Sequence, residues 1–171
     1  EHNRPLQSKV TAITQGKNLF GEYYRTVSTT DYTYKTTTDA RFIDKMDDGT
    51  PILTILYGAI ATAKTTSNTI GWDIWGAKYT TDSTTYYRIE HNRPLQTVVR
   101  AETVGKNAFG EGYTTTSVTI YSYHDLKTAP HNVLGEIRSA FTSSTTKGWD
   151  IWGAEYTTRS MTTYVLEHNR P

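Results

Sequence analysis

A seven-residue block, Gly-Trp-Asp-Ile-Trp-Gly-Ala, occurs twice without change, at 71–77 and at 148–154, and its residue types suit sugar binding. An indole offers an apolar face to a sugar ring, and a carboxylate accepts hydrogen bonds from the ring's hydroxyl groups. Strand alternation would place Trp75 beside Asp73 and away from Trp72. The alternative is that the tryptophans pack in the core. The binding residues predicted from this block are Asp73, Trp75, Asp150 and Trp152.

A second block, Gly-Lys-Asn-X-Phe-Gly-Glu, occurs at 16–22 and at 105–111. Glycine and asparagine favour a tight turn, and turns and loops are where binding residues concentrate. In the alternative interpretation the block is only a structural turn, with Phe20 and Phe109 buried in the core. The binding residues predicted from this block are Lys17, Asn18, Glu22, Lys106, Asn107 and Glu111.

A third block, Glu-His-Asn-Arg-Pro, occurs at 1–5, at 90–94 and at 167–171. Its arginine and asparagine donors and its glutamate acceptor suit a polyhydroxyl ligand. The alternative is a strand-ending turn with an exposed Glu–Arg pair, which would stabilise the fold by less than about 1 kcal/mol. The binding residues predicted from this block are Glu90, His91, Asn92, Arg93, Glu167, His168, Asn169 and Arg170.

Other chemistry has less support in the sequence. His2, His91 and His168 would form a three-histidine zinc site only if the fold brought them together, and no local spacing favours this. The repeated carboxylates resemble a glycosidase pair, but such a pair needs different environments for its acid and its base, and duplication makes them alike. We therefore predict no metal, no cofactor and no enzymatic activity.

The elements that position these blocks follow from comparing the chain with itself. Residues 1–34 align with 90–123 at an offset of 89, and residues 48–94 align roughly with 125–171 at an offset of 77. The extra residues of the first copy, near 36–44, are expected in a surface loop. Within 20–34 the matching residues, apart from Gly21, fall on alternate positions, which is typical of a strand with two different faces. The matching residues are Phe20, Glu22, Tyr24, Thr26, Ser28, Thr30, Tyr32 and Tyr34.

This pattern predicts an all-β fold, an internally duplicated antiparallel β-sandwich or barrel. Its halves, 1–89 and 90–171, would share one core. The long alternating stretch is expected to bend, or to break into two strands near 29–31. Apolar residues at helical spacing within 53–64 and 130–141 leave a β-rich α+β fold, with one short helix in each half, as the alternative.

Composition excludes several partners. The net charge is +1 and the sequence has no basic run, so we expect no nucleic-acid partner. It has no apolar stretch of transmembrane length, so membrane insertion is not expected. The absence of cysteine excludes disulfides and thiolate metal sites. A chain that begins at Glu1 is expected to be either a processed mature protein or one sequenced as isolated, and we predict a secreted or extracellular location.

The function predicted from these observations is that of a lectin, a carbohydrate-binding protein with repeated shallow sites for glycans or glycoproteins. Linked weak sites give useful avidity, which makes duplication sensible, and a homo-oligomer would add to it. The alternative is a structural, self-assembling β-repeat protein without a small ligand. A membrane-active barrel is disfavoured, because charged residues such as Arg25, Asp31 and Lys78 would face lipid.

Overall fold

The computed structural model describes residues 6–35, 41–45, 51–54, 59–90, 92–124 and 136–165. These residues form ten β-strands, and no helix is found among them. The strands are β1 (Lys9–Lys17), β2 (Tyr23–Tyr34), β3 (Arg41–Lys45), β4 (Pro51–Thr54), β5 (Ile60–Trp72), β6 (Lys78–Glu90), β7 (Arg93–Lys106), β8 (Gly112–Tyr123), β9 (Ile137–Trp149) and β10 (Glu155–Val165).

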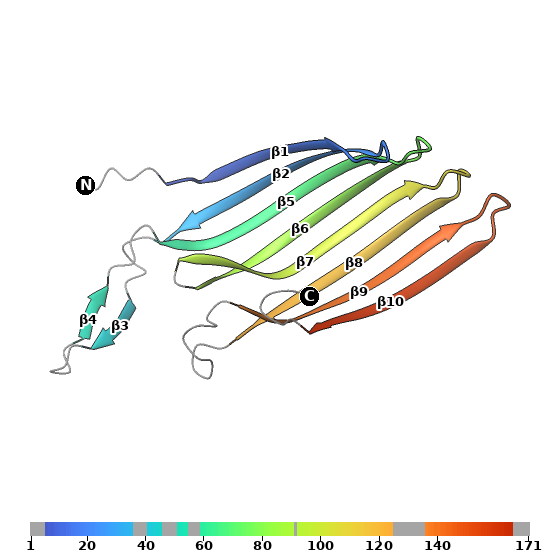
Figure 1. The fold of residues 1–171 in the computed structure, drawn as a ribbon. Helices are drawn as coiled ribbons and strands as arrows, with labels where there is room; N and C mark the ends of the chain where they lie inside the picture. The colour runs from blue at the N-terminus through green and yellow to red at the C-terminus, as the bar shows by residue number, and fades with distance from the viewer. Residues whose placement is uncertain are drawn as a thin grey trace.

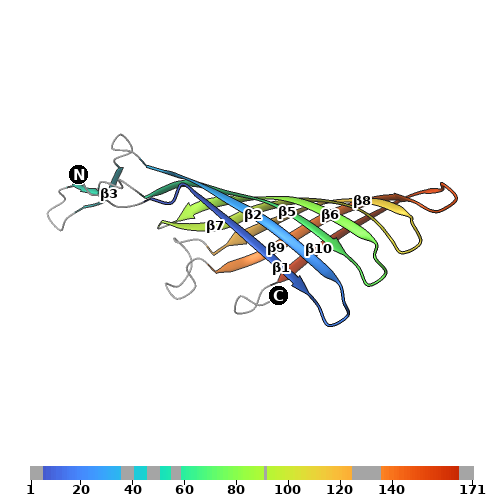
Figure 2. The same ribbon diagram turned by 90° about the horizontal axis from the view of Figure 1, so that it is seen from above.

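Eight of the strands form one antiparallel sheet in the order β1-β2-β5-β6-β7-β8-β9-β10, and β3 and β4 pair separately (Figure 1). The all-β prediction is confirmed. A sandwich or barrel is not confirmed, because the sheet is open and its outer strands β1 and β10 each pair with one neighbour. Figure 2 shows the twist of the sheet, which follows from the right-handed twist of its strands.

The helical alternative is wrong wherever its residues are described. Residues 60–64 belong to β5 and residues 137–141 belong to β9, whereas 55–58 and 130–135 lie outside the described residues. The predicted break near 29–31 is also wrong, because β2 continues through it. The surface-loop prediction for 36–44 is wrong at its end, because Arg41 begins β3. Residues 36–40 lie outside the described residues.

The alternation predicts the two faces of the sheet correctly. One face, which we call the uniform face, carries the same residue types in rows that cross all eight strands. One row consists of threonines: Thr14, Thr26, Thr69, Thr81, Thr103, Thr115, Thr146 and Thr158. The next row holds only serine and alanine: Ala12, Ser28, Ser67, Ser83, Ala101, Ser117, Ser144 and Ser160.

A third row of the uniform face alternates glycine and tyrosine. It consists of Gly16, Tyr24, Gly71, Tyr79, Gly105, Tyr113, Gly148 and Tyr156. Each tyrosine ring covers the glycine of the preceding strand. A Cβ atom added to Gly71 would lie 2.2 Å from the Tyr79 ring, and one added to Gly148 would lie 2.4 Å from the Tyr156 hydroxyl. These glycines are required because the neighbouring rings occupy the space of a side chain.

Hydroxyl groups connect the strands across the uniform face. The side-chain oxygens of Thr26 and Thr69 lie 2.8 Å apart, and those of Ser67 and Ser83 lie 2.7 Å apart. Cross-strand pairs of this kind contribute roughly 0.2–1 kcal/mol each. The opposite face, which we call the charged face, carries the charged side chains of the eight strands, among them Lys64, Asp82 and Glu102.

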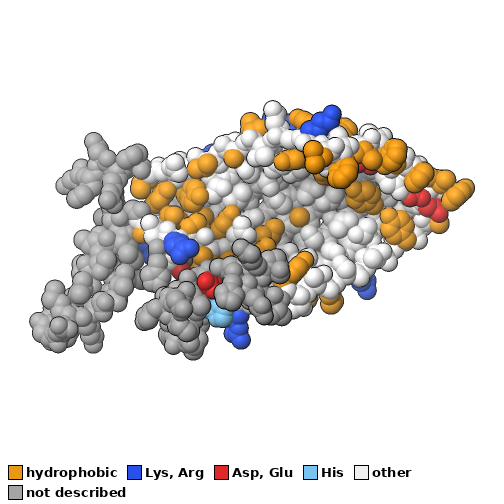
Figure 3. All heavy atoms as spheres, viewed as in Figure 1, with side chains coloured by type: hydrophobic (Ala, Val, Ile, Leu, Met, Phe, Trp, Pro, Cys, Tyr) orange, Lys and Arg blue, Asp and Glu red, His pale blue; other side chains and the backbone are white. Residues whose placement is uncertain are grey.

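The sheet has almost no buried interior. Among the described residues only three hydrophobic side chains, those of Ala63, Leu95 and Ala140, are buried, whereas 22 large hydrophobic side chains are exposed. Figure 3 shows hydrophobic side chains on the surface, including the end of the sheet that carries the hairpin loops. The shared core expected for the two halves is therefore absent from the described residues.

Candidate functional site

Four hairpin loops, each of five residues, lie at the same end of the sheet (Figures 1 and 2). They comprise residues 18–22, 73–77, 107–111 and 150–154. Each begins with asparagine or aspartate and has glycine at its fourth position, with φ between 80° and 93°. Such positive φ values favour glycine, which lacks a Cβ atom. The first two repeated blocks of the sequence thus form one kind of turn.

The first residue of each loop holds the turn together. Asp73 Oδ1 accepts hydrogen bonds from the backbone N–H groups of Trp75 and Ala77, both at 2.8 Å. Asp150 makes the same two bonds with Trp152 and Ala154. This oxygen of each aspartate, predicted to bind sugar hydroxyls, is therefore occupied by its own turn.

Asparagine performs the same role in the other two loops. Asn18 Oδ1 accepts from the N–H groups of Phe20 and Glu22, both at 3.0 Å, and Asn18 Nδ2 donates to the Glu22 carboxylate. Asn107 and Glu111 repeat the arrangement. The predicted turn is confirmed, although the strands extend through Lys17 and Lys106 before it begins.

The apolar residues of these loops point into solvent. Trp75 is 74% exposed and Trp152 is 84% exposed. Phe20 and Phe109, predicted as core residues in the structural interpretation, are 81% and 80% exposed, so that prediction is wrong. A five-residue turn projects beyond the sheet, where no second layer is present among the described residues to cover it.

The strand alternation predicted through the tryptophan block is also wrong, because β5 ends at Trp72 and the loop begins at Asp73. The Trp72 indole packs beside the Tyr23 ring, with centroids 5.5 Å apart, and Lys78 Nζ lies 5.8 Å from its centroid. Trp72 thus lies on the charged face near the sheet's end and is itself exposed.

The Glu-His-Asn-Arg-Pro block at 90–94 lies at the other end of the sheet, where it joins β6 to β7. Asn92 has φ 61° and accepts a hydrogen bond from Ile60 N at 2.7 Å. Glu90 lies opposite Arg93 in the strand register, but its carboxylate forms an ion pair with Arg88, at 2.7 Å. His91 and the residues of 1–5 and 167–171 lie outside the described residues.

The predicted binding residues that the structure describes are therefore divided between the two ends of the sheet. The loop residues, with Lys17 and Lys106 beside them, lie at one end, and Glu90, Asn92 and Arg93 lie at the other. The structure does not bring these groups together into one site. Each hairpin loop instead presents its own exposed apolar residues.

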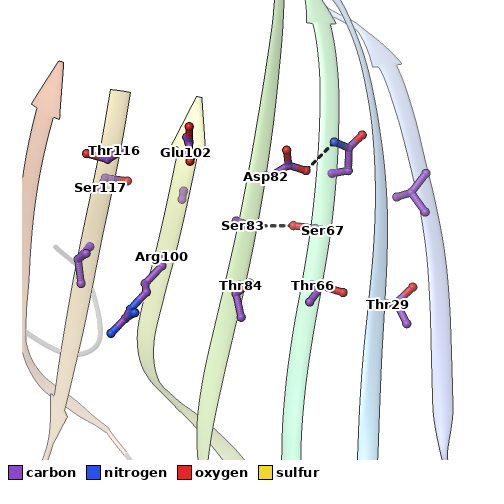
Figure 4. A pocket seen from close by; sticks show the side chains of 14 residues that line it. Thr29, Thr66, Ser67, Asp82, Ser83, Thr84, Arg100, Glu102, Thr116 and Ser117 are labelled. Carbon is purple, nitrogen blue, oxygen red and sulfur yellow. Dashed lines mark hydrogen bonds between the residues drawn. The ribbon is translucent and has the colours of Figure 1, made fainter. Parts of the chain in front are cut away.

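An open trough of about 690 Å³ lies on the charged face, over the middle of the sheet (Figure 4). Asp82 lies directly opposite Glu102, and Asn68 Nδ2 donates to Asp82 Oδ1 at 2.7 Å. Arg100 lies on the same strand as Glu102. The trough combines both signs of charge with threonine side chains, and this does not define one ligand chemistry.

The outer strands were not predicted as functional residues. In β10 residues 155–164 are exposed, and β1 is exposed at all positions except Gly16. Their counterparts in the middle of the sheet are more buried: Tyr156 is exposed, whereas Tyr79, 77 positions earlier, is half-buried. The sequence repeat could have drawn attention to these strands, because β1 matches the sequence of β7 and β10 matches that of β6.

Burial raises the pKa of two tyrosines above the usual 10.0. Desolvation is the main cause for both Tyr113 and Tyr123, with neighbouring Tyr79 adding to the first and Tyr121 to the second. The Tyr123 hydroxyl also donates to the backbone oxygen of Gln96 at 2.6 Å.

In the part of the chain that the structure describes, no cluster of three metal-ligating side chains is found. None of its residues forms a helix long and apolar enough to cross a membrane. No family model matches the chain, and no curated protein or solved structure matches it significantly.

Proposed function

We propose that this chain is a structural β-repeat protein that assembles with copies of itself and has no small ligand. The observation that carries the proposal is that, among the described residues, no second layer packs on the eight-stranded sheet. Stable domains bury a face of each sheet against another layer. Here Ala63, Leu95 and Ala140 are the only buried hydrophobic residues described, and 22 large ones remain exposed. Assembly would cover this surface.

The uniform face supports the same proposal. Its rows consist mainly of threonine, serine, alanine, glycine and tyrosine, without a charged side chain in the threonine, serine–alanine or glycine–tyrosine rows. Burial of such a surface leaves no unpaired charge, which is the most costly group to remove from water. The charged face mixes charged side chains such as Arg100 with exposed apolar ones such as Val118 and Trp72.

The repeated turns also fit a structural role. Asp73, Asp150, Asn18 and Asn107 use their side chains to hold their own loops. Matching blocks are therefore explained by an internal duplication that keeps one turn geometry. A sugar is not needed to account for them.

Sedimentation velocity over a dilution series from about 1 µM to about 100 µM tests the proposal. We expect species heavier than the 19.3 kDa chain, with a mass that rises with concentration. The midpoint of thermal unfolding should rise with concentration as well, because assembly stabilises the folded state by mass action. A stable 19.3 kDa species with a concentration-independent midpoint would contradict self-assembly.

Glycan binding is the second candidate, and it is favoured by the exposed indoles of Trp75 and Trp152. Exposed indoles can stack on sugar rings. A glycan array followed by the variant Trp75→Ala/Trp152→Ala tests it, with Trp72→Ala as a control in the adjacent strand. Binding that is lost only in the first variant would support a lectin. If the protein binds no glycan on the array, the carbohydrate-binding hypothesis is rejected.

A further inference from the structure

The two outer strands repeat the residues of a junction that the chain makes within itself, between β6 and β7. At that junction the uniform face places Tyr79 opposite Gly105, Thr81 opposite Thr103, Ser83 opposite Ala101, and Thr85 opposite Val99. The positions 77 residues after those of β6 lie in β10 and hold Tyr156, Thr158, Ser160 and Thr162. The positions 89 residues before those of β7 lie in β1 and hold Gly16, Thr14, Ala12 and Val10.

We propose that β10 of one copy pairs with β1 of a second copy in this same register. Ser160 then lies opposite Ala12. Toward the hairpin end, Thr158 lies opposite Thr14 and Tyr156 lies opposite Gly16. The inference rests on the proposed function, and it names the partner and one contact between copies, the pairing of their sheet edges. This contact extends the sheet, and covering a face of it requires a further contact between copies.

Strand direction agrees with this pairing. Every neighbouring pair in the sheet is antiparallel, so direction alternates across its eight strands. The first and last strands of such a sheet run in opposite directions. When β10 meets β1 of another copy, the alternation continues, as it does from β6 to β7. The backbone N–H and C=O groups along an unpaired edge are a template for such an added strand.

Charges at the hairpin end favour the contact between copies. One residue beyond the Tyr79–Gly105 pair, the β6–β7 junction places Lys78 near Lys106, two groups of like charge. The corresponding residues of the outer strands are Glu155 and Lys17, which have opposite charges. Opposite charges on facing strands stabilise a sheet, and like charges destabilise it.

On the charged face too, the proposed contact between copies has less charge repulsion than the β6–β7 junction. Asp82 lies opposite Glu102 at the inner junction, whereas the corresponding outer residues are Arg159 and Ile13. Ile13 is 60% exposed and Met161, two positions beyond Arg159, is 77% exposed. Pairing in this register makes Ile13 and Met161 diagonal neighbours, within reach of each other's side chains. The pairing thus removes a like-charge contact and covers two exposed apolar residues.

The first strand carries the usual protection of a sheet edge only at its two ends, Lys9 and Lys17. Monomeric proteins place lysine, proline or a bulge on exposed edge strands to prevent their association. Between Lys9 and Lys17, β1 contains neither a charged residue nor proline, and its register with β2 is continuous. This edge is therefore open to a second copy.

Disulfide mapping tests the register, because the chain contains no cysteine of its own. Ala12→Cys and Ser160→Cys are made in separate chains, which are mixed and oxidised. We expect a disulfide-linked pair of the two variants, because directly opposed residues have the short Cβ separation that a disulfide needs. Thr14→Cys mixed with Ser160→Cys is displaced by two residues and should give at least about tenfold less product.

The variant Ser83→Cys/Ala101→Cys provides an internal control. These residues are opposed within one chain, so an intramolecular disulfide there shows that this pair of positions can be bridged. Circular dichroism of each variant establishes that it remains folded.

Two results of the disulfide experiment would overturn the inference. One is a chain carrying both Ala12→Cys and Ser160→Cys that forms only a monomeric disulfide, since its sheet would then close on itself. The other is linkage that is absent, or equal for the displaced pair, while the unmodified protein still sediments as an assembly. The latter leaves the proposed self-assembly intact, whereas a monomeric unmodified protein would reject both.

Discussion

Tyr79 of β6 lies directly opposite Gly105 of β7, and its Cβ atom is 3.0 Å from the position that a Cβ atom on that glycine would occupy. The Tyr113 hydroxyl approaches the same point from the other side, at 2.8 Å. Glycine at this position therefore allows the tyrosines of the two strands that flank β7 to lie over the uniform face.

A side chain at such a glycine should destabilise the sheet. In Gly71→Ala the new Cβ atom would lie 2.2 Å from the Tyr79 ring, and we expect a loss of about 1–3 kcal/mol in the free energy of unfolding. Urea unfolding followed by circular dichroism measures it. Adding Tyr79→Ser should recover part of the loss, and a double variant no more stable than Gly71→Ala would refute the steric explanation.

The loops provide a matched pair of substitutions. Asp73→Ala removes the acceptor of two backbone N–H groups, and we expect it to cost about 1–3 kcal/mol. Asp73→Asn should be nearly neutral, because Asn18 and Asn107 fill the same role in the other hairpins. Thermal unfolding of both variants decides the question. Equal losses would mean that the charge of Asp73, rather than its acceptor geometry, is important.

Stability should decrease at alkaline pH. The pKa values of Tyr113 and Tyr123 are raised in the fold, so the fold favours the neutral phenols. Their contribution is fully present below the unfolded pKa of about 10 and is lost as pH rises through the raised folded values. Urea midpoints measured from about pH 8 to about pH 11 should therefore decrease.

Tyr123→Phe is the control for this pH dependence, because the Tyr123 hydroxyl donates to Gln96 O and an ionised oxygen cannot. The variant should be less stable at neutral pH and should lose less stability in alkali. An alkaline loss as large as that of the unmodified protein would show that this hydroxyl is not responsible.

Charges placed on the edge strands should control assembly. Thr14 and Thr158 face each other in the proposed contact between copies, so Thr14→Lys/Thr158→Lys should shift assembly to higher concentration by about tenfold or more. Thr14→Glu/Thr158→Lys should assemble better than the double lysine variant. Light scattering against concentration compares them, and identical behaviour would place the contact elsewhere.

The sequence predicted the strands better than the layers. Alternate matches such as Thr26, Ser28 and Thr30 identified the uniform face, because side chains of a strand alternate between its two sides. No residue pattern in the sequence indicates whether a second layer covers that face. For this reason Phe20 and Trp75 could be interpreted as core residues, since aromatic side chains are buried in most folds. They are exposed here because they lie in the hairpin loops.

The repeated turns show what residue types alone leave open about a site. Asp73 and Asn18 belong to recurring blocks, but recurrence alone does not distinguish a ligand contact from a turn that satisfies its own backbone. The distance between Trp75 and Arg93 depends on how the hairpins are arranged along the sheet. That arrangement follows from long-range pairing, which local residue types do not determine.

Hydrogen exchange at the outer strands tests the central claim most directly. Backbone amides of β1 and β10 on the unpaired side of each strand exchange quickly in an isolated sheet and slowly once they are hydrogen-bonded to another copy. We predict that at high protein concentration their protection approaches that of β6 and β7, and that it disappears on dilution. Rapid exchange in β1 and β10 at every concentration, with the inner strands protected throughout, would contradict the claim.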